Sequence, residues 1–449
     1  MKLDELYRDH VARVAADTQK ALEAAARAGQ EFDGVVFHAG GELLVHRDDQ
    51  PYLFRPDFHF ARWVPLAGDD HLIAFTPGET PKLIRVVPRD YWYEAPLPPA
   101  VELDGLFDVH VVEDVDAAVE FLGDHGRHAF VGADDDVLEA LGMEIDAAEP
   151  DALMAHLDWS RGAKTAYEVA CIRAASERAA KGHAAVREGV AARRSERDLH
   201  FDYLRAAALV ENEVPYPAII GWDANAAVLH YTRKDMAAPD PGGVLLIDAG
   251  ATVNGYASDI TRTYATDAAP SLFVELLDGM DALQRELVEA VGPGVPYVEL
   301  HQRAVQGVAA LLAETGILKI GVDEAVERGW GSIFLPHGLG HHLGLQVHDV
   351  GGRQAGPDGG TVDPPEQFPH LRTTRDLAAG HVVTIEPGLY FVPMLLDPRR
   401  DGADADAVDW SKVDTLIPYG GIRIEDDVLV TAEGREDLSR PACPGHQST

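Results

Sequence analysis

Residues Val244 to Ala265 read VLLIDAGATVNGYASDITRTYA, with two β-rich runs on either side of Asn254-Gly255. Asn-Gly between such runs is a strong hairpin signal, because a type I′ turn needs positive φ at both central residues. The predicted cross-strand pairs are Val253 with Tyr256, Gly250 with Asp259, and Asp248 with Thr261. Asp248 and Asp259 are then diagonal neighbours on one face, with Cα atoms roughly 7–8 Å apart.

Two carboxylates at that separation can converge on a pair of metal ions about 3.5–4 Å apart. The alternative interpretation of the hairpin is two solvated aspartates, although Asp is depleted in strands. The hairpin by itself therefore leaves both a divalent-metal site and a plain surface hairpin open.

The composition is that of a globular protein with a strong excess of acid. The chain has 449 residues, 46% hydrophobic and 25% charged, and 38 basic against 75 acidic residues give a net charge of −37. We expect no nucleic-acid partner and no anionic-membrane partner, because both require a basic face. The first residues lack the apolar core of a signal peptide, no run of 18 apolar residues occurs, and Cys171 and Cys443 form no disulfide framework. These features predict a cytoplasmic protein.

The pattern of strands and helices predicts two domains of the α/β (α+β) class. Residues 1–158 are predicted to form a smaller α/β domain with strands at 32–37, 42–45, 108–112 and 128–132 and a hairpin at 71–87 that turns at Pro77-Gly78. Residues 159–440 are predicted to form the second domain, with helices ending near Arg194 and covering about 272–291 and 297–315. Residues 158–164 are expected to be a polar joint, and 356–370 and 397–414 to be surface loops.

Four further clusters carry chemically active side chains. PHGLGHHLGLQVHD, residues 336–349, holds four histidines among glycines, and imidazole is the commonest metal ligand. Glu386 ends the strand VVTI, Arg423 and Glu425 lie two apart in GGIRIEDD, and His230 lies in NAAVLHYT. Each cluster alone is compatible with an exposed loop or strand end. Two Asp, one His and two Glu without cysteine favour Mn²⁺, Co²⁺ or Zn²⁺ over a closed structural zinc site.

In combination these motifs resemble the pita-bread metallopeptidases, and most closely the bacterial Xaa-Pro dipeptidases. The motifs that carry the resemblance, in chain order, are DDQPYLF, DYWYEAPLP, NAAVLHY, IDAG, SDITRT, PHGLGHHLGLQVHDV, IEPGLYF and GIRIEDD. They cover nearly the whole chain. The resemblance implies a pita-bread catalytic domain behind the smaller N-terminal domain, and two divalent ions, most often Mn²⁺.

The resemblance also implies roles for individual residues. The metal ligands are expected to be Asp248 on one ion, Asp259 and Glu425 bridging, and His341 and Glu386 on the other. His348 and His230 are expected to contact substrate near the scissile bond, and Arg372 to hold the substrate's terminal carboxylate. Arg423 matches the arginine of the family's GIRIE strand, and Glu386 is expected to move the proton from water to the leaving nitrogen.

The function that follows is hydrolysis of a dipeptide with C-terminal proline by a metal-bridging hydroxide. One alternative is aminopeptidase P-like removal of the residue before proline in longer peptides, which the carboxylate-binding Arg372 disfavours. Phosphotriester hydrolysis is expected only as a side activity. A non-catalytic pita-bread binding module is a third alternative, which the five ligand types argue against. The resemblance further implies a homodimer in which Asp48 or Asp49 and Trp92 cap the partner's site.

Overall fold

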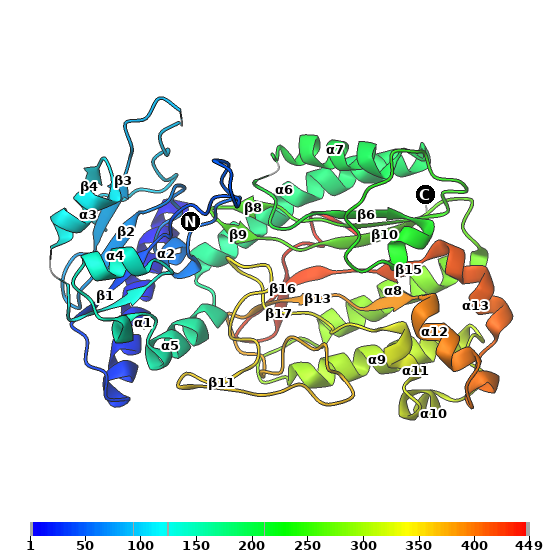
Figure 1. Cartoon of the computed structure of the whole chain (residues 1–449). Helices are drawn as coiled ribbons and strands as arrows, with labels where there is room; N and C mark the ends of the chain where they lie inside the picture. The colour runs from blue at the N-terminus through cyan, green and yellow to red at the C-terminus, as the bar shows by residue number, and fades with distance from the viewer. Residues whose placement is uncertain (1–2, 93, 124, 211, 446–449) are drawn as a thin grey trace. The chain divides into compact units, whose positions relative to one another are not determined.

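The computed structural model describes residues 3–92, 94–123, 125–210 and 212–445 (Figure 1). The chain divides into two compact units. Unit 1 comprises Met1–Arg161, Thr165–Ala170 and Gln354–Gly360, and unit 2 comprises Gly162–Lys164, Cys171–Arg353 and Thr361–Thr449.

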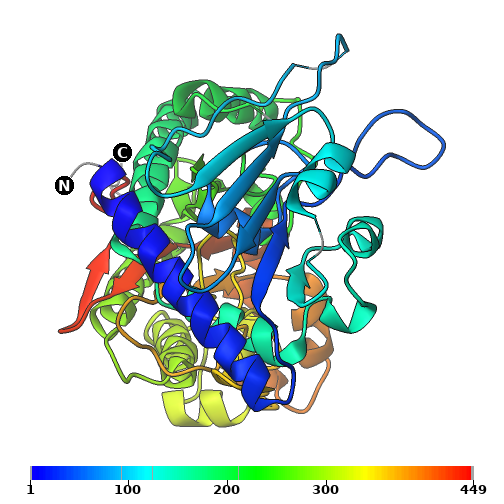
Figure 2. The same ribbon diagram turned by 90° about the vertical axis from the view of Figure 1, so that its left-hand side faces the viewer.

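Unit 1 is built on a five-stranded mixed sheet in the order β4-β3-β2-β1-β5. The strands are β1 (Gly34–His38), β2 (Leu72–Phe75), β3 (Lys82–Val86), β4 (Asp108–Val112) and β5 (His128–Val131). Its helices are α1 (Leu3–Arg27), α2 (Phe58–Trp63), α3 (Val115–Leu122), α4 (Asp135–Ala140) and α5 (Asp151–Gly162), with the 3₁₀ turn η1 (Ile145–Ala147). Figure 2 shows α1 as the long blue helix, which contacts β1 and α2. Alternation along β1 sends Val36 into the core with α3 and α4, while Phe37 packs on Trp63 of α2.

Unit 2 consists of two β layers, each covered by a pair of helices. The first sheet has the order β10-β7-β6, formed by β6 (Ile219–Trp222), β7 (Val244–Asp248) and β10 (Thr261–Ala265). Its buried side chains share a core with α6 (Ala166–Ala191) and α7 (Glu196–Ala207). The second sheet has the order β13-β16-β17, formed by β13 (Val382–Ile385), β16 (Asp426–Val430) and β17 (Arg435–Asp437). The helices α8 (Ser271–Glu289) and α9 (Tyr297–Glu314) pack on it over the largest core of the chain (Figure 1).

Shorter elements join these layers. A two-stranded sheet of β14 (Gly388–Tyr390) and β15 (Gly421–Arg423) continues toward β10, and an antiparallel bridge pairs Thr261 with Glu425. The remaining elements are η2 (Asp223–Ala227), α10 (Val322–Glu327), α11 (Trp330–Phe334), β11 (Gln354–Gly356), β12 (Gly359–Thr361), α12 (Pro393–Arg400), η3 (Ala405–Ala407), α13 (Trp410–Leu416) and η4 (Ile417–Tyr419). The bridge brings the ends of the two sheets together at one edge of unit 2.

The predicted hairpin and its register are confirmed. β8 (Thr252–Val253) and β9 (Tyr256–Ala257) pair Val253 with Tyr256, and β7 and β10 pair Asp248 with Thr261. Asn254 and Gly255 have φ of 51° and 84°, as a type I′ turn requires. A slip by one residue would send one aspartate to the other face of the sheet.

Three expectations about local structure are wrong. Residues 42–45 form no strand, because Leu44 meets only Pro51 in an isolated bridge and both Leu43 and Leu44 stay exposed. Residues 158–162 continue α5 instead of forming a joint. The acidic stretch 397–414 contains helical segments, because Leu396, Val413 and Leu416 are buried in the large core. Apolar burial at those few positions outweighs the acidic composition.

We predict that Gly255→Ala destabilises unit 2. The φ of 84° disfavours any side chain, and the added Cβ would meet Leu345 Cδ2 at 3.1 Å. A cost of about 1–2 kcal/mol follows, which corresponds to a fall of roughly 2–4 °C in Tm by calorimetry. Gly321→Ala is the matched control, because Gly321 has φ of −69° and open space around its Cβ position. Equal Tm values for the two variants would contradict the turn assignment.

Candidate metal centre and substrate pocket

The five predicted ligands converge in unit 2 from separate segments of the chain. Asp248 ends β7, Asp259 lies between β9 and β10, and His341 follows α11. Glu386 directly follows β13, and Glu425 lies between β15 and β16. Four of the five are buried, and Glu386 is 17% exposed. Strand ends and strand breaks therefore carry every member of the cluster.

His341 lies at the centre of this cluster. Its Nε2 is 3.5 Å from Asp259 Oδ2 and 3.6 Å from Glu386 Oε1. Its Nδ1 donates to the His342 carbonyl at 3.0 Å, so Nε2 is the ring nitrogen that faces the carboxylates. Burial alone would lower the pKa of His341, but the hydrogen bond with Asp259 and the charge of Glu386 raise it. One ligand atom from each of Asp259, His341 and Glu425 lies within 4.8 Å of the other two. This donor set is the kind that holds Mn²⁺, Co²⁺ or Zn²⁺.

The electrostatics of the cluster fit divalent cations. Burial raises the pKa of Asp248 and Glu425, and the neighbouring Asp259 raises both further. Burial likewise raises the pKa of Glu386 to about 7. Among the described residues, the buried Oδ1 of Asp248 has no hydrogen-bond partner. These carboxylates disfavour one another's ionisation, and one carboxylate oxygen has no partner within the described chain. A bound cation would stabilise the ionised carboxylates and could bind to the open oxygen.

Arg423 is the cation beside this cluster, and three partners fix its guanidinium. Nη2 donates to Asp248 Oδ2 at 2.6 Å, Nη1 to the Tyr390 hydroxyl at 2.9 Å, and Nε to the Thr261 hydroxyl at 3.2 Å. Tyr390 is also 2.9 Å from Nε2 of His337. Burial lowers the pKa of His337 to about 3, so this histidine is neutral near pH 7. Arg423 therefore orients Asp248 and, through Tyr390, a neutral histidine.

Other groups that hold the carboxylates were absent from the sequence prediction. The Tyr216 hydroxyl donates to Asp259 Oδ1, and the Thr261 hydroxyl donates to Glu425 Oε2 at 2.6 Å. Thr261 lies inside the SDITRT motif and pairs with Asp248 in the hairpin, and this predicted pairing could have indicated that Thr261 lies close to the ligands. Tyr216 lies in the segment between α7 and β6, where the local sequence pattern gave no indication of a contact with Asp259.

A cavity of about 400 Å³ opens beside His341. Its wall comprises His341, His342, His348, Asp349, Arg353, Pro369, His370, Leu371 and Arg372. The rings of His348 and His341 meet edge to face at 4.4 Å, and burial lowers the pKa of His348 to about 4. Arg372 is exposed at the cavity. The structure thus brings His348 and Arg372 together next to the metal cluster.

Two predicted site residues lie outside that wall. Within the described part of the chain, neither Arg423 nor His230 lines the cavity. Arg423 is 5% exposed and contacts Asp248 instead of the open space. His230 is exposed, and positive charge on it would slightly lower the pKa of His337 and His348.

Family models match both parts of the chain. Residues 170–432 match the model of metallopeptidase family M24, and residues 5–159 match the model described as Xaa-Pro dipeptidase, N-terminal domain. The chain belongs to metallopeptidase family M24. The M24 match contains all five converging residues.

Bacterial relatives of this M24 protein carry the name Xaa-Pro dipeptidase. The protein from Stenotrophomonas maltophilia K279a is 40% identical over 97% of both chains, and that from Xanthomonas campestris pv. campestris B100 is 41% identical over 98% of both. The relative from Pseudoalteromonas atlantica is 38% identical over 98% of both chains. These matches extend over both units.

Solved structures show the same fold. Aminopeptidase PepP from Pseudomonas aeruginosa superimposes with a TM-score of 0.71 at 24% identity, covering 97% of this chain and 96% of that one. Escherichia coli aminopeptidase P with the inhibitor Pro-Leu gives 0.72 at 22% identity over 95% of each chain. The predicted α/β class with a pita-bread catalytic domain is thereby confirmed. Among the described residues, no helix is long and apolar enough to cross a lipid bilayer.

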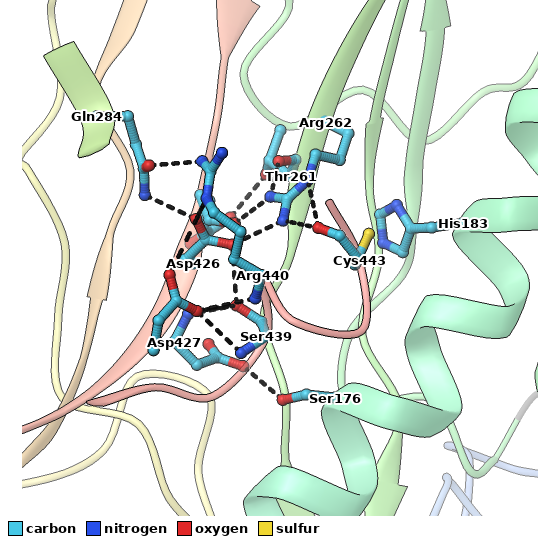
Figure 3. Close-up of polar contacts among 12 residues, drawn as sticks. Ser176, His183, Thr261, Arg262, Gln284, Asp426, Asp427, Ser439, Arg440 and Cys443 are labelled. Atoms are coloured by element: carbon cyan, nitrogen blue, oxygen red, sulfur yellow. Dashed lines mark hydrogen bonds and ion pairs between the residues drawn. The ribbon is translucent and has the colours of Figure 1, made fainter. Parts of the chain in front are cut away.

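A network of buried polar residues contacts the chain segments next to the five converging residues, and Figure 3 draws this network around Arg262 and Asp426. The Asp259 backbone N–H faces both Asp427 oxygens at 3.2 Å, and Ser176 of α6 donates to the same carboxylate. Arg262 is fully buried and donates to the Glu425 carbonyl at 2.7 Å and to Asp426 Oδ1 at 2.7 Å. The run Glu425-Asp426-Asp427 thus provides one predicted ligand and two anchors.

Asp426 connects this layer to the end of the described chain. Its Oδ2 accepts from Arg440 Nε at 2.7 Å and from Gln284 of α8 at 2.9 Å. Ser439 donates to its Oδ1, and Arg262 also donates to the Cys443 carbonyl. The segment after β17 is therefore bound through Ser439, Arg440 and Cys443 to Asp426 of β16 and Arg262 of β10 (Figure 3).

We predict that Asp259→Asn removes bound divalent metal. The substitution leaves His341 Nε2 and Glu425 facing an amide, which is a weaker ligand for a divalent cation than a carboxylate. Metal per chain, measured by atomic emission after gel filtration, should fall by about tenfold or more. Asp323→Asn on the exposed face of α10 is the control and should retain metal. Unchanged metal in Asp259→Asn would exclude Asp259 as a ligand.

We also predict that the metal-free protein loses stability as pH rises. The pKa of Glu386 is about 7 in the fold, above its value of about 4.3 in an unfolded chain. The folded state therefore binds the proton more tightly than the unfolded chain does. The resulting stabilisation, up to roughly 4 kcal/mol, is fully present below about pH 4.3 and is lost as the pH rises to about 7.

Thermal unfolding in EDTA from pH 5 to 8 measures this effect. Glu386→Gln should flatten the pH dependence, whereas Glu188→Gln on the exposed side of α6 should leave it unchanged. Saturating Mn²⁺ should reverse the slope, because deprotonated ligands bind metal. A slope that Glu386→Gln leaves unaltered would contradict the assignment to this carboxyl.

Proposed function

We propose that this M24 enzyme hydrolyses dipeptides with a C-terminal proline. The observation that carries the proposal is the convergence of Asp248, Asp259, His341, Glu386 and Glu425 beside a cavity with Arg372 in its wall. The names of the bacterial relatives support the same substrate class. The cavity's volume of about 400 Å³ suits a small ligand better than an extended chain.

The residues around the cavity have separable tasks in this proposal. The guanidinium of Arg372 holds the proline carboxylate, because its planar fork matches both oxygens. His348, neutral because burial lowers its pKa to about 4, donates a hydrogen bond to the scissile carbonyl oxygen as negative charge develops there. Glu386 accepts the proton of the attacking water and returns it to the proline nitrogen.

Divalent cations held by the five converging residues would supply Lewis acidity and a nucleophile at neutral pH. We propose two such ions, which Asp248, Asp259, His341, Glu386 and Glu425 would hold between them, with Mn²⁺ as the preferred metal. The absence of cysteine from the donor set supports this preference over a structural zinc site. His230 is proposed to contact the substrate from the segment after β6, and Arg423 to act by orienting Asp248.

The assembly and compartment are part of the same proposal. Loops of unit 1 expose large apolar residues, and a second copy of the chain is the proposed partner that covers them. The side chains are Leu43, Leu44, Tyr52, Leu53, Tyr91 and Trp92. Asp48 and Asp49 lie on the first of these loops and are exposed. Cys171 and Cys443 are buried and neither is in a disulfide, which supports a reducing cytoplasm.

Arg372 distinguishes the dipeptidase from an aminopeptidase P-like enzyme. We expect the Mn²⁺-loaded protein to cleave Ala-Pro and Leu-Pro and to leave Ala-Pro-Ala intact. Arg372→Gln should raise KM for Ala-Pro by about 10- to 100-fold with a smaller change in kcat, because a charge-assisted pair of hydrogen bonds is lost. The control is Arg303→Gln on the exposed side of α9. Cleavage of Ala-Pro-Ala without cleavage of the dipeptides would overturn the proposal.

A further inference from the structure

Glu196 is a buried carboxylate outside the metal centre that the proposed mechanism does not use. It is the first residue of α7 and is 2% exposed. The preceding Ser195 caps the helix through Asp198 N, so Glu196 is not needed as the cap. Burying a carboxylate is costly unless its oxygens are hydrogen-bonded. Its partners therefore indicate what it does.

Among the described residues, the Glu196 carboxylate accepts four hydrogen bonds, and all four come from one segment of the chain. Oε1 accepts from the Trp222 backbone N–H and from Asn225 Nδ2, both at 2.8 Å. Oε2 accepts from the Tyr231 hydroxyl and from the Asp235 backbone N–H, both at 2.6 Å. These donors span residues 222–235, which we call the His230 segment. A glutamine at position 196 would turn an NH₂ group toward two donors, so the segment is complementary to a carboxylate alone.

Further contacts fix the His230 segment at other points. The Tyr231 side chain is buried in a small core with Ile219, Ala226 and Leu246. The Arg197 backbone N–H donates to the Asp235 carbonyl at 3.2 Å. The helix α7 and the strand β6 that leads into the segment are in contact, as Figure 1 also shows. The first turn of α7 is thus the support on which the segment rests.

His230 directly precedes Tyr231 in this segment. His230 itself is exposed, and positive charge on it would lower the pKa of His337 and of His348, of which His348 lines the cavity. The hydrogen bonds that fix this part of the segment are made by Tyr231 and Asp235, so the position of His230 follows from its neighbours in the chain. A displacement of Tyr231 would move His230 relative to the pocket.

We propose that Glu196 is a positioning residue that sets the place of His230 at the substrate through Tyr231 and Asp235. The inference rests on the proposed substrate contact of His230. It assigns a role to a carboxylate that neither binds metal nor touches substrate. If Glu196 instead served only to stabilise α7, substituting it would lower stability, and its effect on activity would be the same whether or not His230 is present.

The test is a double-mutant cycle of Glu196→Gln and His230→Ala on Mn²⁺-loaded protein. Glu196→Gln should lower kcat/KM for Ala-Pro by about 10- to 100-fold, because small displacements of a positioned group are costly. In the His230→Ala background the same substitution should change kcat/KM by less than about threefold. Metal per chain should remain at the wild-type value. Glu188→Gln, the same charge change at an exposed position of α6, should leave kcat/KM unchanged in both backgrounds.

Equal fold losses in both backgrounds, or no loss at all, would overturn the inference. Full activity of His230→Ala would overturn the role of His230 and the inference with it. If Glu196→Gln does not fold, Tyr231→Phe removes one of the four donors and keeps the buried ring. It should give a smaller loss with the same dependence on His230, and additive losses would count against the proposal.

Hydrogen exchange tests the inference without turnover. In Glu196→Gln, amides of residues 225–235 should exchange at least about tenfold faster, with β7, β10 and β16 unchanged. Unchanged exchange in that segment would overturn the inference whatever the substrate is. Faster exchange combined with no cleavage of Ala-Pro by the wild type would support the anchoring by Glu196 and overturn the proposed substrate class instead.

Discussion

Mutual repulsion among buried carboxylates is the constraint on which the catalytic unit depends. Burial raises the pKa of Asp248, Glu386 and Glu425, and the negative charge of the neighbouring Asp259 raises all three further. Arg423 pairs with Asp248 at 2.6 Å, and His341 Nε2 lies 3.5 Å from Asp259 and 3.6 Å from Glu386. Because ionised carboxylates repel one another, the fold must hold each of these side chains in place with other contacts. The surrounding donors, Tyr216 and Thr261, and the Asp427 carboxylate behind Asp259 serve that purpose.

The two-layered architecture supplies that restraint because the ligand-bearing strands are tied together at their backbones. Arg262 donates from one guanidinium to the carbonyls of Thr261 and Glu425 and to Asp426. It therefore fixes the spacing between the hairpin that carries Asp259 and the strand break that carries Glu425. Its hydrogen bonds go to the carbonyls of Thr261, Glu425 and Cys443 and to the Asp426 carboxylate, which compensates for burying the charge. The same guanidinium also binds the segment after β17 through the Cys443 carbonyl.

Local sequence patterns predicted the parts of the site that depend on local geometry. The period of two and the Asn-Gly turn place Asp248 opposite Thr261, as the structure confirms. Tyr216 and Asp427 escaped prediction because they reach Asp259 across 43 and 168 residues of sequence. No periodicity encodes such contacts. The helices within 397–414 were missed for a related reason, since the burial of Leu396, Val413 and Leu416 depends on a core formed by distant helices.

The metal cluster and the substrate groups are restrained in different ways, and this difference has a functional consequence. The cluster residues lie at strand ends and strand breaks of two joined sheets, so their positions follow from sheet register. His230 lies in a segment outside the strands, and the Glu196 carboxylate alone accepts four of its hydrogen bonds. Changes in that anchor are expected to move His230, the proposed substrate contact, while the register that sets the cluster stays intact. If His230 does contact substrate, different residues control substrate preference and metal affinity in this fold.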